Sequence, residues 1–398
     1  MMPRSSKKYV CGFYGARDGY EVALALHEAG WLEVLLTDFY GENTWLKKLG
    51  LARVSRSHPK LPPEKVCGSP WLSVAKMAAA RVFPDAELQN HLTDYLLSRR
   101  IGRAAVRNQA HIFTYEPYAV RRPNGGFSQG RKQILFHFHP HVDMEDAIYA
   151  EDQRRFPEFY RELKVTESPY RKRTADAWRQ ADLILCASSF TRDSLVAAGM
   201  PKEMCRVVPY GVKSPDAGNG ASRQGPLKLL FVGRNPLRKG LHHLILAWQE
   251  AKKRPADRLT IVCAGSGRAV RELAVGQEDV AWKEYVSGEE LTRLYREADA
   301  LVVPSLCEGF GHVYLEAMGH GCAVVGTAHS ALPDLGGEKD GVFLVPVGQP
   351  GKLADLISRA SIDPGNFRSK SEAARKRAGE FTWEKFRGGI REAVKSLV

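Results

Sequence analysis

Two glutamates separated by seven residues, Glu308 and Glu316, are the first candidates for chemistry in this sequence. Glu308 lies in a loop that follows the apolar run Ala300–Val303, and Glu316 lies about two turns into the helix expected next. A second apolar run, Ala323–Val325, completes a strand–loop–helix–strand unit. Ligands of such units bind beyond the carboxyl end of the strand, where N–H groups at the helix start favour anions. The spacing therefore predicts an anion site beside two carboxylates.

A basic loop follows another predicted strand, Leu227–Val232, and contains Arg234 and Lys239. Two cations beside a helix N-terminus could hold a diphosphate. The alternative is that both are solvated loop residues, but their place directly after a strand favours the diphosphate. A similar small-residue loop, starting at Gly265, follows the predicted strand Leu259–Ala264.

The first half opens with the same order of elements. A predicted strand, Tyr9–Tyr14, leads into a glycine-containing loop, Gly15–Gly19, and then into a helix, Tyr20–Ala29. This order is the beginning of a doubly wound sheet. The loop lacks the G-x-G-x-x-G pattern, so it does not indicate a dinucleotide site. It is either a phosphate-binding loop or an ordinary strand-to-helix turn.

Three histidines at a spacing of two, His137, His139 and His141, follow a strand that begins at Gln133. Such spacing raises the possibility of a metal site, but no cysteine or Glu-x-x-His partner accompanies them. We expect no metal here. His139, at the end of the strand, is instead predicted to hydrogen-bond a sugar hydroxyl or a phosphate.

The length of 398 residues and the repeated α/β pattern predict two Rossmann-like doubly wound domains that face each other across a cleft. The segment rich in Gly, Ser and Pro at 214–226 is the best linker. We therefore expect an acceptor-binding domain over 1–213 and a donor-binding domain over 227–377. A basic amphipathic helix over 378–398 is expected to return to the first domain.

The net charge of +13 is unevenly distributed, since residues 47–81 and 99–132 each hold eight Lys or Arg against a single acid. Basic patches attract nucleotide diphosphates, anionic lipids or nucleic acid, and charge alone does not distinguish these. The bases cluster outside the second half rather than in a stripe with aromatics, so no nucleic-acid partner is expected.

The seven scattered cysteines and the lack of a long apolar segment predict a cytoplasmic protein. Trp71, Val74, Ala75 and Ala78 would share one face of a helix. This helix either packs on the core or lies on the inner face of the cytoplasmic membrane as a peripheral contact with anionic lipid.

These motifs resemble the retaining glycosyltransferases of family 4, which have the GT-B fold and an E-x7-E motif. EGFG at 308–311 and LEAM at 315–318 carry the motif. The resemblance is specific over 208–398 and loose over 1–207. The other matching segments are VPYGV (208–212), FVGRNPLRKG (231–240), AGSG (264–267), ELTRLYREADALVVPS (290–305), GVFLVPVGQPGKLADLI (341–357) and FTW (381–383).

The resemblance implies a role for each site residue. Gly233, Arg234 and Lys239 would hold the donor diphosphate, Glu316 the ribose hydroxyls, and Glu308 the hydroxyls of the sugar. His139 would lie beside the donor sugar and, with Arg234, Lys239 and Glu308, would serve catalysis. The remaining donor-binding positions are Gly15, Gly265, Phe310, Gly311, His312 and Val313, with Tyr285 and Val286 at the nucleobase.

The expected activity is transfer of a sugar from a nucleotide diphosphate sugar to an acceptor hydroxyl with retention, in cell-envelope glycan, lipopolysaccharide or exopolysaccharide synthesis. No Asp-x-Asp triplet is present, so no cofactor is expected and the reaction should not need a metal. The acceptor would be a glycan, a lipid-linked molecule or another hydroxyl compound. A GT-B nucleotide-sugar hydrolase or epimerase, or a silent nucleotide-sugar-binding protein, remains an alternative.

Two departures from the family pattern concern the ligand contacts. His312 and Val313 stand where the family often has an aliphatic residue and Val or Pro, and the Gly15–Gly19 loop lacks the usual double glycine. The sugar contacts and the acceptor side are the parts of the site that these positions affect.

Overall fold

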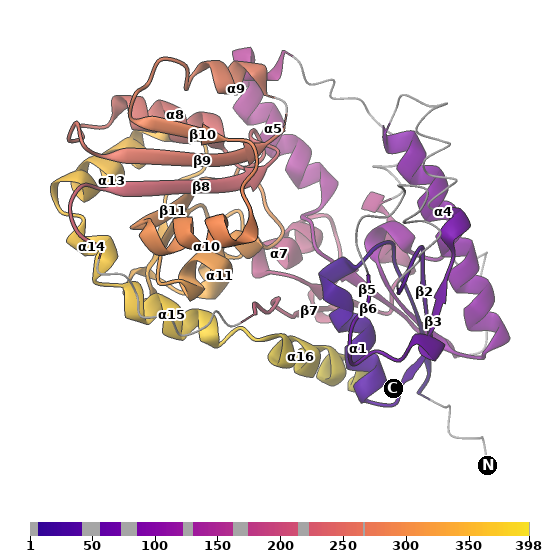
Figure 1. Ribbon diagram of the computed structural model, residues 1–398. Helices are drawn as coiled ribbons and strands as arrows, with labels where there is room; N and C mark the ends of the chain where they lie inside the picture. The colour runs from indigo at the N-terminus through magenta and orange to yellow at the C-terminus, as the bar shows by residue number, and fades with distance from the viewer. Residues whose placement is uncertain are drawn as a thin grey trace.

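The computed structural model describes residues 7–41, 56–72, 86–121, 130–161, 174–213, 223–265 and 267–397. Its described strands form two separate parallel sheets, one in each half of the chain (Figure 1). The first has the order β3-β2-β1-β4-β5-β6-β7 and the second β10-β9-β8-β11-β12-β13. The strands are β1 (Tyr9–Gly12), β2 (Leu32–Thr37), β3 (Val66–Gly68), β4 (His111–Tyr115), β5 (Gln133–His137), β6 (Leu183–Cys186), β7 (Cys205–Val207), β8 (Lys228–Arg234), β9 (Arg258–Ala264), β10 (Val280–Lys283), β11 (Ala300–Val303), β12 (Ala323–Gly326) and β13 (Val342–Leu344).

Helices alternate with these strands and cover the sheets (Figure 1). Side-chain caps fix several helix starts: Ser188, Ser287 and Thr382 each accept a hydrogen bond from the backbone N–H three residues on. The described helices are α1 (Glu21–Glu28), α4 (Ala86–Arg107), α5 (Val142–Arg155), α7 (Ser189–Ala197), α8 (Leu241–Glu250), α9 (Arg268–Glu272), α10 (Gly288–Glu297), α11 (His312–Gly319), α12 (Leu332–Leu335), α13 (Pro350–Ile362), α14 (Gly365–Arg368), α15 (Ser371–Gly379) and α16 (Trp383–Lys395).

Each sheet reverses its strand order beside its first strand, β1 in the first half and β8 in the second. In open parallel sheets, ligands bind at such switch points, beyond the carboxyl ends of the strands. The loops after β8 and β11 therefore meet, because these two strands are paired through Ala300 and Leu229. These are the loops that contain Lys239 and Glu308.

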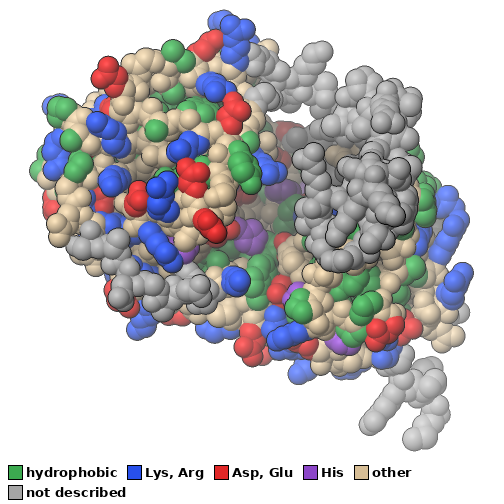
Figure 2. Space-filling view, in the orientation of Figure 1, with side chains coloured by type: hydrophobic (Ala, Val, Ile, Leu, Met, Phe, Trp, Pro, Cys, Tyr) green, Lys and Arg blue, Asp and Glu red, His purple; other side chains and the backbone are tan. Residues whose placement is uncertain are grey.

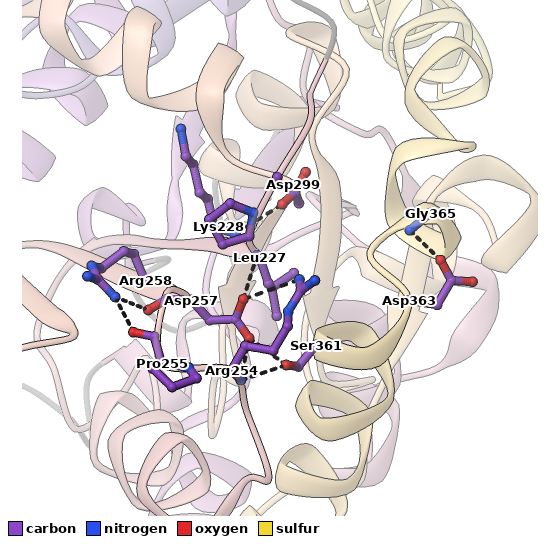
Figure 3. Close-up of polar contacts among 12 residues, drawn as sticks. Leu227, Lys228, Arg254, Pro255, Asp257, Arg258, Asp299, Ser361, Asp363 and Gly365 are labelled. Carbon is purple, nitrogen blue, oxygen red and sulfur yellow. Dashed lines mark hydrogen bonds and ion pairs between the residues drawn. The ribbon is translucent and has the colours of Figure 1, made fainter.

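A buried carboxylate fixes the start of β8 (Figure 3). Asp257 accepts hydrogen bonds from the backbone N–H of Leu227 at 2.7 Å and of Arg254 at 3.0 Å, and also from the Ser361 hydroxyl of α13. One strand further along, Asp299 accepts from the N–H of Lys228 at 3.0 Å. Two carboxylates thus set the register of the strand whose other end carries the basic loop.

The last helix, α16, returns to the first half and packs on α1 (Figure 1). Arg387 forms ion pairs with Glu21 and Glu28 of α1, and Arg391 pairs with Glu28 at 2.6 Å. The ring of Phe386, which is 2% exposed, packs against Phe136 of β5 in the first half. The expected pair of doubly wound Rossmann-like domains with a returning helix is confirmed.

Some sequence predictions lie outside the described residues. Residues 214–222 of the expected linker do, as do Val74, Ala75 and Ala78 of the expected amphipathic helix. Trp71, the first residue of that face, is 51% exposed. None of the helices that the structure describes is long and apolar enough to cross a membrane.

Candidate active site

The centre of the candidate site is a buried carboxylate between two cations. Glu308 Oε2 lies 2.6 Å from Lys239 Nζ, and Glu308 Oε1 lies 3.6 Å from a guanidinium nitrogen of Arg238. Burial alone would raise the pKa of Glu308, but the charges of Lys239 and Arg238 outweigh it and lower the pKa to about 2. Glu308 is therefore ionised at neutral pH, and it cannot act there as a proton donor.

Close backbone approach brings these side chains together. A Cβ on Gly233 would lie 2.2 Å from Lys239 Cδ, so a larger residue would displace the lysine stem that crosses the end of β8. A Cβ on Gly309 would lie 1.6 Å from the carbonyl oxygen of Phe138 in the first half. Ser188 Oγ donates to the carbonyl of Gly309 at 2.5 Å. The loop that carries Glu308 is thus pressed against the first domain.

His139 lies across the cleft from this pair, two residues beyond the end of β5. Its Nδ1 is 3.4 Å from a guanidinium nitrogen of Arg238. Burial and the charge of Arg238 lower the pKa of His139 to about 4, so the imidazole is neutral at neutral pH. Histidine side chains are visible in the hollow between the two halves (Figure 2). The structure thus brings His139, Lys239 and Glu308 together.

Glu316 lies on α11 and accepts a hydrogen bond from the Tyr295 hydroxyl at 3.0 Å. The helix begins at His312, after Gly311 with a left-handed φ of 87°. The His312 ring is 4.6 Å from the ring of Tyr210. Phe310 is buried, and its ring meets Tyr210 edge-on at 5.3 Å. The N–H groups at this helix start therefore lie beside the contact between the two halves of the chain.

The other predicted residues differ in their exposure. Arg234 is the last residue of β8 and is exposed, Tyr285 is 85% exposed, and Val286 and Val313 are half-buried. Gly265 directly follows β9 and lies near the loop after β8. The N–H of Gly15 donates to Asp38 Oδ1 at 2.8 Å, so this predicted phosphate-binding amide is already hydrogen-bonded to a carboxylate.

Sequence reasoning missed Arg238. It contacts both Glu308 and His139. In the sequence, Arg238 is marked only by its position directly before Lys239 in the basic loop that follows the predicted strand.

The three spaced histidines have separate roles. His137 Nδ1 lies 3.0 Å from Glu116 Oε2, and the His141 side chain caps α5 by accepting from the N–H of Asp143.

Among the described residues, the group that could hold a metal is elsewhere, between α5 and α8. It consists of Asp152, His242 and His243, whose imidazole Nε2 atoms lie 2.9 Å and 2.8 Å from the carboxylate oxygens. The His242 contact is a hydrogen bond, whereas His243 Nε2 and Asp152 Oδ1 are buried without a hydrogen-bonding partner.

Comparison with known proteins identifies the second half. Residues 226–363 match the family model described as "Glycosyl transferases group 1". The amylovoran biosynthesis glycosyltransferase AmsK of Erwinia amylovora is 31% identical over 196 residues, which cover 46% of this chain and 48% of the relative. The chain spans about half the length of the curated relatives it matches.

Solved structures resemble the whole chain. Sucrose-phosphate synthase of Thermosynechococcus elongatus superposes with a TM-score of 0.63 at 17% identity and covers 98% of this chain and 99% of its own. HepE of Anabaena, in complex with UDP and glucose, superposes with a TM-score of 0.62 at 15% identity, with 98% and 99% coverage. At these identities the likeness establishes the fold, which is GT-B.

Proposed function

We propose that this chain, whose residues 226–363 match the group 1 glycosyltransferases, transfers a sugar from a nucleotide diphosphate sugar to an acceptor hydroxyl with retention of configuration. The observation that carries the proposal is the Lys239–Glu308–Arg238 cluster at the switch point of the second sheet. It combines a lysine for the diphosphate with a carboxylate for sugar hydroxyls.

In the proposed mechanism, Lys239 and Arg234 bind the diphosphate and stabilise the charge that grows on it as the glycosidic bond breaks. Lys239 has three N–H donors, so it can keep Glu308 while it binds phosphate. Glu308 accepts hydrogen bonds from the sugar, and Glu316 holds the ribose. These assignments leave no pair of carboxylates for double displacement. The acceptor hydroxyl therefore attacks from the face of the leaving diphosphate, which takes its proton.

The remaining roles follow the same arrangement. The N–H groups from Phe310 to Val313 lie at the start of α11 and would bind phosphate or sugar. Neutral His139 would hydrogen-bond the sugar. We propose that this chemistry needs no metal ion, because Lys239 and Arg234 would stabilise the charge on the leaving diphosphate. Activity that persists at full rate in EDTA supports this, and activity lost to EDTA and restored by one divalent ion contradicts it.

The biological setting is proposed from the relatives. AmsK belongs to amylovoran synthesis, and a lipopolysaccharide outer core galactosyltransferase, WaaB, has the same fold. We infer that this chain acts in the cytoplasm on an envelope polysaccharide or its lipid-linked precursor, with peripheral contact to the inner face of the membrane. The basic segments at 47–81 and 99–132 support an anionic partner.

A thermal-shift screen of UDP-, GDP- and ADP-sugars, followed by incubation of the best donor with candidate acceptors, tests the proposal. We expect stabilisation by one nucleotide series and a product with the donor's anomeric configuration by NMR. Release of free sugar or of an epimer without acceptor would favour the hydrolase or epimerase. Donor binding without turnover on any acceptor would favour the silent binding protein.

A further inference from the structure

A cavity of about 470 Å³ opens between the two halves beside the candidate active site. Most of its wall comes from the first half, and Arg238 contributes from the second. Its charged and titratable lining includes Arg17, Asp94, Glu116, His139, Glu145 and Arg238. The cavity therefore reaches from the first-domain glycine loop to the residues that face the donor.

Arg17, in the short 3-10 turn η1 (Arg17–Tyr20), supplies the cation at the far end. Its guanidinium carbon lies 4.0 Å from the centre of the Phe138 ring and 5.1 Å from that of Tyr115. A guanidinium above an aromatic ring can still donate its in-plane N–H groups to an anion. Tyr118 is its hydrogen-bonding partner, while its Nε is buried with none.

Within the described part of the chain, no carboxylate forms an ion pair with Arg17. The side chain of the adjacent Asp18 accepts the Tyr115 hydroxyl at 2.6 Å. Glu116 lies against His137, and burial raises the pKa of Glu116 to about 8, which keeps it protonated at neutral pH. Arg17 is half-buried, and Asp18, whose charge acts on it, already accepts the Tyr115 hydroxyl, so this position suits a further anion supplied by a ligand.

The opposite end of the cavity fits the hydroxyl-bearing part of the same ligand. Arg238 lies there, 3.4 Å from His139 and 3.6 Å from Glu308. The acidic side chains of Asp94 and Glu145 line the wall, and carboxylates accept hydrogen bonds from hydroxyls. An anchored anionic group would thus leave hydroxyls directed toward the donor sugar.

We propose that the acceptor carries an anionic group, a phosphate or a carboxylate, and that Arg17 binds this group in the cavity. The inference rests on the proposed glycosyl transfer and specifies the acceptor class. Guanidinium groups match both anions through two parallel hydrogen bonds.

The test uses inorganic phosphate and acetate as probes on the full chain, with the most stabilising nucleoside diphosphate present at saturation to occupy the donor loops. We expect at least one probe at tens of millimolar to raise the melting temperature, and Arg17→Gln to abolish that rise. A response to phosphate alone assigns a phosphorylated acceptor, and a response to acetate alone a carboxylated one. No Arg17-dependent response to either anion overturns the proposal.

Two controls separate this role from a structural one. Arg179→Gln removes an exposed arginine that also stacks on an aromatic ring, 4.5 Å from Trp178, and should leave the response unchanged. Without anions, Arg17→Gln should keep the wild-type stabilisation by the nucleoside diphosphate, because Arg17 lies outside the donor loops and the variant stays folded. A lower melting temperature with an unchanged anion response assigns Arg17 to packing and overturns the proposal. Arg17→Lys should retain part of the response.

The failure of this inference is distinguishable from the failure of the proposed function. If the wild type binds nucleotide but shows no Arg17-dependent response to either anion, only the acceptor class is rejected. If no nucleotide stabilises the chain, the proposed function fails, and the anion titration on the free protein still decides the role of Arg17.

Discussion

At the scale of single residues, the site depends on a competition between burial and charge. Glu308 is 8% exposed, yet its carboxylate stays ionised because Lys239 lies 2.6 Å away and Arg238 is close behind. Removing one partner of such a buried pair leaves an uncompensated charge. The same lysine is proposed to hold the donor diphosphate, so its loss should affect folding and activity separately.

We expect Lys239→Ala to lower the free energy of unfolding by roughly 3 kcal/mol and turnover by a factor of about 100 or more. The double variant Lys239→Ala/Glu308→Ala should recover much of the stability and none of the activity. Urea unfolding and transfer rates measure the two effects. The exposed Lys352→Ala on α13 is the matched control. Near wild-type turnover of Lys239→Ala would contradict the assignment.

At the scale of elements, α8 links the donor loop to the first half. It begins just after Lys239, and its residues His242 and His243 hold Asp152 of α5. The Tyr160 hydroxyl donates to the same carboxylate at 2.6 Å. Burial lowers the pKa of His242 to about 4, so the network depends on a neutral imidazole. Its stability should therefore depend on pH.

Stability should be greatest near pH 6.5. Burial lowers the pKa of His137 to about 3 and of His139 and His242 to about 4, so the unfolded chain binds more protons than the folded one below pH 6.5. The pKa of Glu116 is raised to about 8, so between about pH 4.5 and 8 the folded chain binds more protons at this carboxyl than the unfolded one. This carboxyl alone would make the protein less stable as the pH rises through that range. Below pH 6.5 the three histidines together change the stability more than the one carboxyl does.

Denaturant unfolding at pH 5.0, 6.5 and 8.0 checks this dependence. The free energy of unfolding should fall below pH 6.5 by on the order of 1 to 3 kcal/mol per pH unit. His242→Gln should reduce the slope of the free energy of unfolding against pH by the amount that corresponds to about one proton taken up on unfolding. Stability that is flat or rises from pH 6.5 to 5.0 would show that these imidazoles are not buried neutral.

At the scale of the whole molecule, the two sheets are joined by a returning helix as well as by the cleft. Phe386 of α16 packs on Tyr210, whose ring also contacts His312 at the start of α11. Arg387 and Arg391 hold the same helix to α1 by ion pairs. The same aromatic cluster, centred on Tyr210, therefore contacts both the returning helix α16 and the start of α11.

Phe386→Ala should lower the free energy of unfolding by about 3 to 5 kcal/mol, because it empties a fully buried site. Lys385→Ala, at the exposed neighbouring position, should change it by less than about 0.5 kcal/mol. Chemical denaturation of both variants makes the comparison. Equal stability of the two variants would mean that α16 does not secure the first domain.

Local pattern predicted the doubly wound sheets and the loops that hold Lys239 and Glu308, because strand, loop and helix follow one another in sequence. It did not predict Arg238, whose contact with His139 joins residues 99 positions apart. Arg17 was missed for the same reason: its stacking on Phe138 depends on how β1 and β5 align. Contacts between separate loops have no periodic signal in the sequence.

The central claim is that the loops after β8 and β11 bind a nucleotide diphosphate sugar. Calorimetric titration of wild type and Lys239→Ala with the most stabilising of the UDP-, GDP- and ADP-sugars tests it most directly. We predict saturable one-to-one binding by the wild type, weakened at least about tenfold in Lys239→Ala. No binding of any nucleotide sugar to the wild type, or equal binding by both proteins, would contradict it.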